Sequence, residues 1–219
     1  MSDTPEEEDE FQTLHEIVAA ARRRLHPQHW DYLMGATETE TTMKRNRRAI
    51  DSVAFRPRVL RDVRTVNVTG TVLGRPTRLP LLLAPIGGVE AFDPEGAAAC
   101  GKASAEFGVP HMLSSACFPG LEETAKAADN ARIYQLYVRG DDAAVDEIVK
   151  RAIDNNYFAF CMTVDSAHYS RRERDITSRY AKPWRQNVKG REYQMSLSWR
   201  EVHRFIETHP DYPLVIKGI

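Results

Sequence analysis

The sequence lacks the features that mark several large classes of protein. None of its apolar runs approaches the roughly 20 residues that a membrane-spanning helix needs. The net charge is only −1 and the pI lies near 6.7, so the excess of basic residues that binds nucleic acid is missing. We therefore expect a protein that engages neither a membrane nor a nucleic acid.

Cysteine is scarce as well. Only Cys100, Cys117 and Cys161 are present among 219 residues. An odd number of cysteines without paired spacing favours reduced thiols in the cytoplasm. The small or apolar neighbours of all three predict that they are packing residues. Histidine, cysteine and aspartate nowhere gather at the spacing of a metal site, so we expect no bound metal.

The first part of the chain is predicted to be an extension ahead of the main body. Residues 1–10, "MSDTPEEEDE", are acidic and lack an apolar core, which predicts a disordered tail rather than a signal peptide. Apolar residues at helical spacing predict a helix over residues 11–25 and a second amphipathic stretch over residues 30–50. The alternating segment 66–80 contains turn glycines and predicts a short hairpin. This extension spans residues 11–78.

From residue 79 onward, continuous apolar runs alternate with amphipathic stretches. Asp93 and Pro94 are expected to open one helix, which Gly108 closes, and Ser198 with Glu201 predicts a capping box before another. Such alternation is typical of a parallel β-sheet that is covered by helices. The expected strands are residues 79–84, 109–114, 133–138, 157–164 and 213–216.

A doubly wound sheet and a barrel both fit this order. The segment "APIGGVEAF" after the first run is not the G-x-G-x-x-G of a dinucleotide-binding sheet. Polar or conformationally special residues end all five runs, which favours a TIM (β/α)8 barrel, because an open sheet gathers ligands only at its switch point. A complete barrel has eight strands in about 250 residues, so residues 79–219 are predicted to be its N-terminal part. The strand-end residues are Pro85, Gly87, Ser114, Ser115, Gln135, Tyr137, Thr163, Asp165 and Lys217.

Seven stretches of the chain carry a family resemblance. They are "WDYLMGATETETTMKRNRRAIDSVAFRPRVLRDV", "LPLLLAPIGG", "FDPEGAAACGKASAEFGVPHMLSS", "IYQLYVRGD", "MTVDSAHYSRRERD", "LSWREV" and "PLVIKGI". In this order and spacing they resemble the FMN-dependent 2-hydroxy acid oxidases and dehydrogenases, such as glycolate oxidase, lactate oxidase and mandelate dehydrogenase. The resemblance implies that a small 2-hydroxy acid is oxidised to the 2-oxo acid with hydride transfer to N5 of FMN.

The resemblance also implies an FMN site at the strand ends. Lys217 matches the family lysine that faces N1 of the flavin, where a positive charge stabilises the reduced, anionic ring. Gln135 and Thr163 match positions that hydrogen-bond the edge of the ring, and Ser114 matches another flavin contact. Close approach of backbone to N5, which glycine permits, is implied for Pro85, Ile86 and Gly87.

For the substrate, the resemblance implies two tyrosines and one arginine. Tyr32 and Tyr137 match family residues that bind the carboxylate and the hydroxyl, and Arg171 matches an arginine suited to a planar carboxylate. Tyr137 and Lys217 are therefore the expected catalytic residues. His168 lies in the same loop, but nothing in the resemblance makes it the base, and the other arginines of "YSRRERD" fit salt bridges.

Two departures leave alternatives open. Ala116 stands where the family often has a larger group, which gives room for a larger substrate such as a modified amino acid or alcohol. The family's histidine base, second arginine and phosphate loops follow later strands than those expected here. We therefore expect either a split or partial enzyme, completed by a second polypeptide or further segment, or a non-catalytic half-barrel subunit. Many relatives are tetramers, so a homo-tetramer is expected.

Overall fold

The computed structural model describes residues 10–183 and 189–219, so the predicted acidic tail falls almost wholly outside the described residues. The chain divides into two compact units. The first unit comprises residues 1–50 and 171–180, and the second comprises residues 51–170 and 181–219. The hairpin belongs to the second unit, and the predicted domain boundary at residue 78 stays a prediction.

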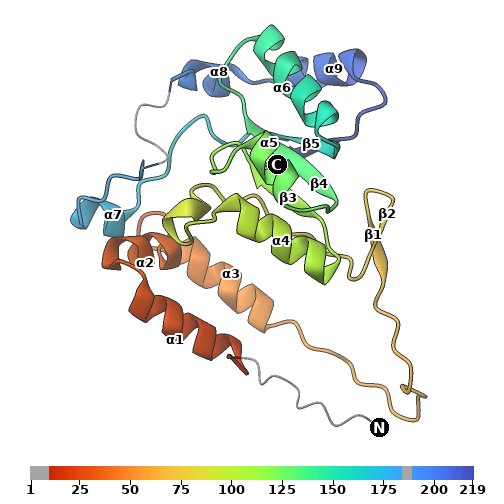
Figure 1. Cartoon of the computed structure of the whole chain (residues 1–219). Coiled ribbons are helices and arrows are strands. Elements are labelled where there is room, and N and C mark those ends of the chain that lie inside the picture. Colours follow the sequence, from red (N-terminus) through yellow and green to blue (C-terminus); the bar gives the residue numbers. More distant parts are fainter. Residues whose placement is uncertain (1–9, 184–188) are drawn as a thin grey trace. The chain divides into compact units, whose positions relative to one another are not determined.

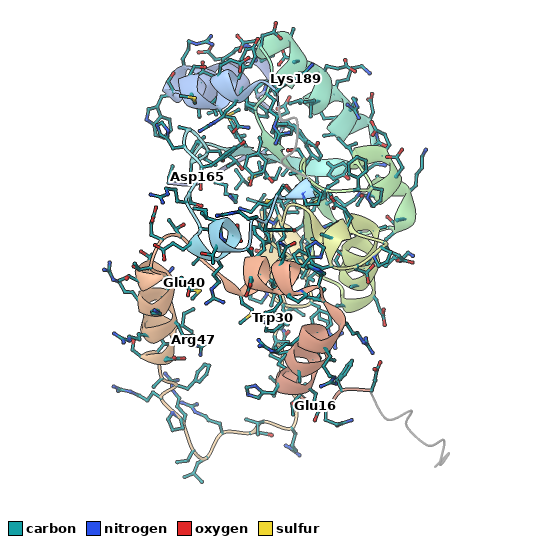
Figure 2. The ribbon with its side chains drawn as sticks, turned by 90° about the vertical axis from the view of Figure 1, so that its left-hand side faces the viewer. Glu16, Trp30, Glu40, Arg47, Asp165 and Lys189 are labelled. Atoms are coloured by element: carbon teal, nitrogen blue, oxygen red, sulfur yellow. The ribbon has the colours of Figure 1, made fainter. Side chains whose placement is uncertain are left out.

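The first unit is helical (Figure 1). It contains α1 (Leu14–Arg24), α2 (Pro27–Met34), nearly all of α3 (Thr41–Asp51) and the short α7 (Glu173–Thr177). Trp30, labelled in Figure 2, lies on α2. The centroid of its ring is 5.2 Å from the guanidinium carbon of Arg22 on α1. The amphipathic stretch predicted over residues 30–50 is divided between two helices, α2 and α3. Gly35 leaves the helical conformation and ends α2, with its N–H donating to the Asp31 carbonyl at 2.8 Å.

The second unit is built on a four-stranded parallel sheet whose strands neighbour one another in chain order. The strands are β3 (His111–Ser114), β4 (Arg132–Tyr137), β5 (Tyr157–Thr163) and β6 (Leu214–Lys217), and the two-stranded hairpin is β1 (Gly70–Val72) with β2 (Arg75–Thr77). The helical elements are η1 (Val89–Ala91), α4 (Ala97–Phe107), α5 (Leu121–Ala127), α6 (Asp142–Asp154), α8 (Arg191–Ser196) and α9 (Trp199–Thr208).

One of the five expected strands is replaced by a single bridge. Leu83 accepts from the Met112 N–H at 3.0 Å and donates to the Pro110 carbonyl at 2.9 Å, but no ladder extends along residues 79–84. Pro80 and Pro85 lack the N–H that a ladder needs, which explains the interruption. The sheet is therefore four-stranded, and it does not close into a barrel within the described residues.

The helix ends test the capping predictions. The Ser198 and Glu201 capping box is present at α9, and Gly108 ends α4 in the left-handed conformation with φ of 78°. The predicted start of α4 is wrong by a turn. The Asp93 carboxylate accepts from the Glu95 N–H at 2.8 Å and closes a turn ahead of the helix, which begins at Ala97.

The sheet separates two apolar clusters. On the face covered by helices, Phe160 of β5 is fully buried and stacks on Phe205 of α9, with ring centroids 5.4 Å apart. The opposite face, called here the inner face, carries a smaller cluster of Met112, Ile133, Ala159 and Cys161. This alternation follows from the two-residue period of a strand.

The packing role predicted for the cysteines is confirmed for two of them. Cys117 and Cys161 are buried and Cys100 is partly buried, all as free thiols. Burial raises the pKa of the Cys161 thiol to about 11, against a smaller opposing effect of the Lys217 charge. A thiol with so high a pKa carries little thiolate at neutral pH, so Cys161 is unsuited to act as a nucleophile.

A pH dependence of stability is expected from His111, at the amino end of β3. Burial, with the Arg132 charge beside it, lowers the pKa of His111 from 6.5 to about 4. Between these values the unfolded chain binds more protons than the folded one, so stability falls as the pH falls from about 6.5 to about 4. Urea unfolding should show that the wild type loses about 3 kcal/mol more than His111→Leu between pH 7 and pH 4. Parallel pH profiles of the two proteins would contradict this.

Candidate active site at the carboxyl end of the sheet

Five of the strand-end residues predicted from the sequence share the inner face. Ser114, Gln135, Thr163 and Lys217 each follow an inner-face apolar residue by two positions, and Tyr137 follows Gln135 by two, so all five point to the same side of the sheet. The register aligns them across the strands, because Ser114 pairs with Gln135 and Thr163 pairs with both Tyr137 and Lys217. The sheet therefore brings Ser114, Gln135, Tyr137, Thr163 and Lys217 to one edge of one face.

Gln135 and Thr163 form the buried centre of this edge. Gln135 Nε2 donates to Thr163 Oγ1 at 2.8 Å, and neither residue is exposed to solvent. The Gln135 Oε1 atom is buried with no hydrogen-bond partner among the described residues. An unmet acceptor in such a place costs free energy unless a ligand donates to it. The amide is thus positioned to recognise an N–H donor that lies over the inner face.

Lys217 supplies the positive charge of the edge. Its carbonyl accepts from the Val164 N–H at 3.0 Å, which fixes the backbone at the end of β6. Its side chain is half-buried, and its charge acts on the Cys161 thiol of β5, which points to the inner face. The ammonium therefore lies on the same side of the sheet as Gln135 and Thr163.

The segment Pro85–Gly88 lies against the loop after β3. Gly88 N–H donates to the Ala116 carbonyl at 2.9 Å. A Cβ added at Gly87 would lie 3.2 Å from the Cβ of Ala116 and 4.0 Å from Ser114 Oγ. Glycine at position 87 thus keeps the backbone bare beside Ser114, as close approach of a flat ligand requires.

Tyr137 and Asp165 complete the strand ends. The backbone N–H of Tyr137 donates to Ser115 Oγ at 3.0 Å, and its side chain is half-buried. Asp165, labelled in Figure 2, is exposed, and a Cβ added at Gly218 would lie 2.5 Å from its Cβ.

The remaining predicted residues, Tyr32 and Arg171, lie in the first unit. Arg171 is exposed, whereas Arg172 is half-buried with its guanidinium 4.4 Å from the ring centroid of Tyr32. Arg172 also donates to the carbonyls of Tyr32, at 2.7 Å, and of Gly35. The run of arginines in the sequence gave no sign of which one contacts Tyr32. His168 is exposed.

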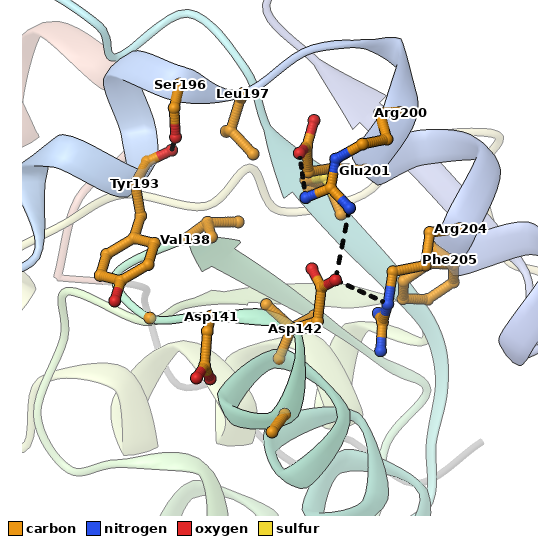
Figure 3. Close-up of a pocket in the computed structure, with 14 residues that line it drawn as sticks. Val138, Asp141, Asp142, Tyr193, Ser196, Leu197, Arg200, Glu201, Arg204 and Phe205 are labelled. Carbon is orange, nitrogen blue, oxygen red and sulfur yellow. Dashed lines mark hydrogen bonds and ion pairs between the residues drawn. The ribbon is translucent and has the colours of Figure 1, made fainter.

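A cavity of about 340 Å³ lies between α6 and α9 on the helical side of the second unit (Figure 3). Arg204 is paired with Asp142 at 3.1 Å and with Asp146, and Arg200 is 3.4 Å from Asp142. The Arg204 guanidinium holds the pKa of Asp146 below its usual range. Because both arginines face carboxylates, this cavity is a poor site for an anion, and the inner face remains the stronger candidate.

The described residues were also searched for a metal site and for a membrane-spanning helix. Residues 10–183 and 189–219 contain no group of three or more histidine, cysteine, aspartate or glutamate side chains that would hold a metal ion. None of the helices described in these two ranges is long and apolar enough to cross a membrane.

The sequence and the structure of this chain are similar to those of several known proteins. The chain is 31% identical to glycolate oxidase 1 of Zea mays and 30% identical to glycolate oxidase of Spinacia oleracea, over 96% of its length and 63% of theirs. It superposes on mandelate oxidase with a TM-score of 0.84 at 31% identity, covering 95% of this chain and 63% of that one. It superposes on an active chimera of (S)-mandelate dehydrogenase with a TM-score of 0.83 at 28% sequence identity.

The chain thus spans less than two thirds of the length of these relatives. The likeness confirms the predicted fold, the N-terminal part of a (β/α)8 barrel that follows a helical extension. Residues 21–219 match the model of the FMN-dependent dehydrogenases, and the chain belongs to this family.

Proposed function

We propose that this chain supplies the flavin-facing half of an oxidoreductase that converts a 2-hydroxy acid into the 2-oxo acid with FMN as cofactor. The observation that carries the proposal is the inner-face array of Gln135, Thr163 and Lys217, with the unmet buried acceptor of Gln135. Glycolate and mandelate, named in the relatives, are both 2-hydroxy acids.

The donor set fits the isoalloxazine ring of FMN. Gln135 Oε1 suits a ring N–H, while Thr163 and Ser114 offer hydroxyl groups that suit ring nitrogens and carbonyls. The bare backbone at Gly87, with Pro85 and Ile86 before it, leaves room for the flat ring. We propose that these residues and Lys217 hold the cofactor.

The chemistry divides between cofactor and protein. FMN supplies a hydride acceptor when it is bound. The Lys217 ammonium would stabilise negative charge on the bound flavin ring and so favour the reduced flavin over the oxidised one. Tyr137, at the end of β4, is proposed to donate a hydrogen bond to the substrate, as is Tyr32 of the first unit.

The substrate carboxylate is proposed to bind an arginine of the loop after β5. Arg171 is the residue that the resemblance implies. Arg172 holds Tyr32 through its ring and its carbonyl, so it is proposed to position that tyrosine. A planar guanidinium matches a carboxylate with two parallel hydrogen bonds, which fixes the orientation of a small acid.

The proton of the substrate hydroxyl needs a base, and we propose that this base lies outside the chain described here. His168 is exposed and no family match supports it. A second polypeptide or further segment that completes the barrel is proposed to bring the base and the phosphate site. A homo-tetramer and a cytoplasmic location stay predictions.

The test is anaerobic titration of the protein purified from its natural host together with any co-purifying polypeptide. Glycolate, lactate or mandelate should bleach the visible absorbance of the oxidised flavin. The matched control is 3-hydroxypropionate, whose hydroxyl is on the wrong carbon and which should leave the spectrum unchanged. A yellow protein that no 2-hydroxy acid bleaches would refute the proposed reaction, and a colourless complex would favour a non-catalytic subunit.

A second candidate substrate class follows from Ala116. Its small side chain lies beside Gly87, at the segment proposed to face the flavin. A larger acid, modified amino acid or alcohol would therefore find space that a bulky residue would fill. Bleaching by a larger substrate but not by glycolate would select this alternative, and an Ala116→Trp variant should then lose the larger substrate while keeping its flavin.

A further inference from the structure

An ion pair inside the first unit joins two residues that lie 134 positions apart in the sequence. Glu40, labelled in Figure 2, lies between α2 and α3, and Arg174 lies on α7. Arg174 donates from Nη2 to Glu40 Oε2 at 2.8 Å, and its Nε atom is 2.6 Å from Oε1. The Glu40 side chain is only 13% exposed. Two parallel contacts between a planar guanidinium and a carboxylate fix their orientation as well as their distance.

The segment that carries Arg174 also contacts the backbone next to Tyr32. A Cβ added at Gly35 would lie 3.0 Å from Cδ of Arg174 and 2.6 Å from the carbonyl oxygen of Asp31, so a side chain at position 35 would force the backbone to shift. Arg172, two residues before Arg174, donates to the carbonyls of Tyr32 and Gly35. Two arginines of one short segment therefore contact the end of α2, where Tyr32 lies.

The loop between α2 and α3 has a backbone conformation that its residues rarely adopt. Glu38 and Glu40 have φ of 49° and 62°, in the left-handed region. The Glu38 N–H donates to the Arg171 carbonyl at 2.9 Å, and the Glu40 carboxylate accepts from the Ala36 N–H at 3.2 Å. Such conformations cost free energy and persist only where surrounding contacts hold the chain. The ion pair between Glu40 and Arg174 is therefore a contact that holds a strained loop in place.

Tyr32 packs against the same distant segment. The guanidinium carbon of Arg172 lies 4.4 Å from the centroid of the Tyr32 ring, and the centroid of the Tyr180 ring lies 6.2 Å from it. The Tyr180 hydroxyl is buried with no hydrogen-bond partner among the described residues. The carboxylate of Asp175, which is buried, lies 3.9 Å from Nε of Arg172. A shift of residues 171–180 relative to α2 would therefore disturb the ring of Tyr32.

We propose that Glu40 and Arg174 are positioning residues for Tyr32 and thereby set how tightly the 2-hydroxy acid binds. The inference rests on the proposed function, in which Tyr32 donates a hydrogen bond to the substrate. A binding group that is displaced by 1 Å can cost roughly 10²-fold, so the fixed place of Tyr32 matters. A hydrogen bond that is kept throughout the reaction contributes to binding and not to the limiting rate. Loss of the ion pair should therefore weaken binding of the acid and leave the limiting rate of flavin reduction nearly unchanged.

Amide hydrogen exchange tests whether the ion pair holds the loop, in protein purified from its natural host with any co-purifying polypeptide. Glu40→Gln keeps the shape of the side chain and removes its charge. Exchange in peptides that span residues 35–40 should become about ten-fold faster, as expected for the loss of one hydrogen-bonded charge. The matched control is Glu10→Gln, which removes the charge from an exposed ion pair with Arg24 in the same unit and should leave this exchange unchanged. Unchanged exchange in Glu40→Gln would overturn the proposal.

Anaerobic titration tests whether Tyr32 carries the effect to the substrate. The acid is whichever of glycolate, lactate and mandelate bleaches the wild-type flavin. The concentration that half-saturates the reduction rate should rise about ten-fold in Glu40→Gln, while the limiting rate changes by less than about two-fold. In a Tyr32→Phe background the same substitution should add less than about two-fold, because the hydroxyl that it positions is absent. A full ten-fold loss in that background would overturn the role given to Tyr32.

A second variant and the wild-type spectrum separate the remaining outcomes. Arg174→Lys keeps the charge and loses the planar fork, so it should weaken binding in the same direction, and it replaces Glu40→Gln if that variant does not fold. Faster exchange in a protein whose wild-type flavin no 2-hydroxy acid bleaches would refute the proposed reaction, and the effect on substrate binding with it. Bleaching of the wild type with unchanged half-saturation in both variants would refute the positioning role alone.

Discussion

Replacing Lys217 by methionine is expected to slow reduction of the bound flavin by roughly 10²–10³-fold, the usual effect of removing one group that stabilises developing charge. Methionine is also an unbranched side chain, one heavy atom shorter than lysine, and it removes the charge together with the N–H donors of the ammonium. The half-buried position of Lys217 and its influence on the Cys161 thiol place the ammonium on the inner face, where it is partly shielded from solvent. Stopped-flow mixing with excess 2-hydroxy acid measures the rate.

The control for this variant is Lys217→Arg, which retains the charge and should keep a larger share of the rate. The reduction potential of the bound flavin gives a second readout, and it should fall in Lys217→Met and not in Lys217→Arg. If both variants reduce flavin as fast as the wild type and leave the potential unchanged, the lysine is only a strand-end residue.

Replacing Phe160 by alanine is expected to lower the free energy of unfolding by about 3–5 kcal/mol, as for other fully buried phenylalanines. Phe160 lies at the centre of the helical face of the sheet. It stacks on Phe205 and lies 6.0 Å, centroid to centroid, from the ring of Tyr134. Alanine would leave a cavity among rigid aromatic rings that cannot collapse to fill it. Urea unfolding followed by circular dichroism measures the loss.

The matched control is Phe107→Ala, which removes the same side chain from the end of α4. Phe107 is 43% exposed and contacts the guanidinium of Arg78 at 4.5 Å, so the loss should stay below about 1.5 kcal/mol. Equal losses in the two variants would contradict the view that the core lies between the sheet and α9.

Much of this architecture was predictable because strands impose a strict two-residue period. Gln135, Thr163 and Lys217 each follow an inner-face apolar residue by two positions, and parallel pairing then aligns these polar residues across the sheet. The capping box at α9 was also predictable, because the hydrogen bonds between Ser198 and Glu201 form within one turn of the chain.

The predictions that failed did so where a single proline or glycine, or a contact between distant residues, overrides the local apolar pattern. Residues 79–84 are as apolar as a strand, but Pro80 and Pro85 break the ladder. Gly35 ended a helix that the apolar pattern continued through. The contact between Arg172 and Tyr32 joins positions 140 residues apart, and nothing local distinguishes Arg172 from Arg171.

The order of the strands has a consequence for synthesis. Each strand from β4 to β6 pairs with the strand made just before it. As the chain leaves the ribosome, every new strand finds its template already present and the helix between them can cover the growing face at once. The sheet therefore grows in one direction during synthesis, from β3 through β4 and β5 to β6.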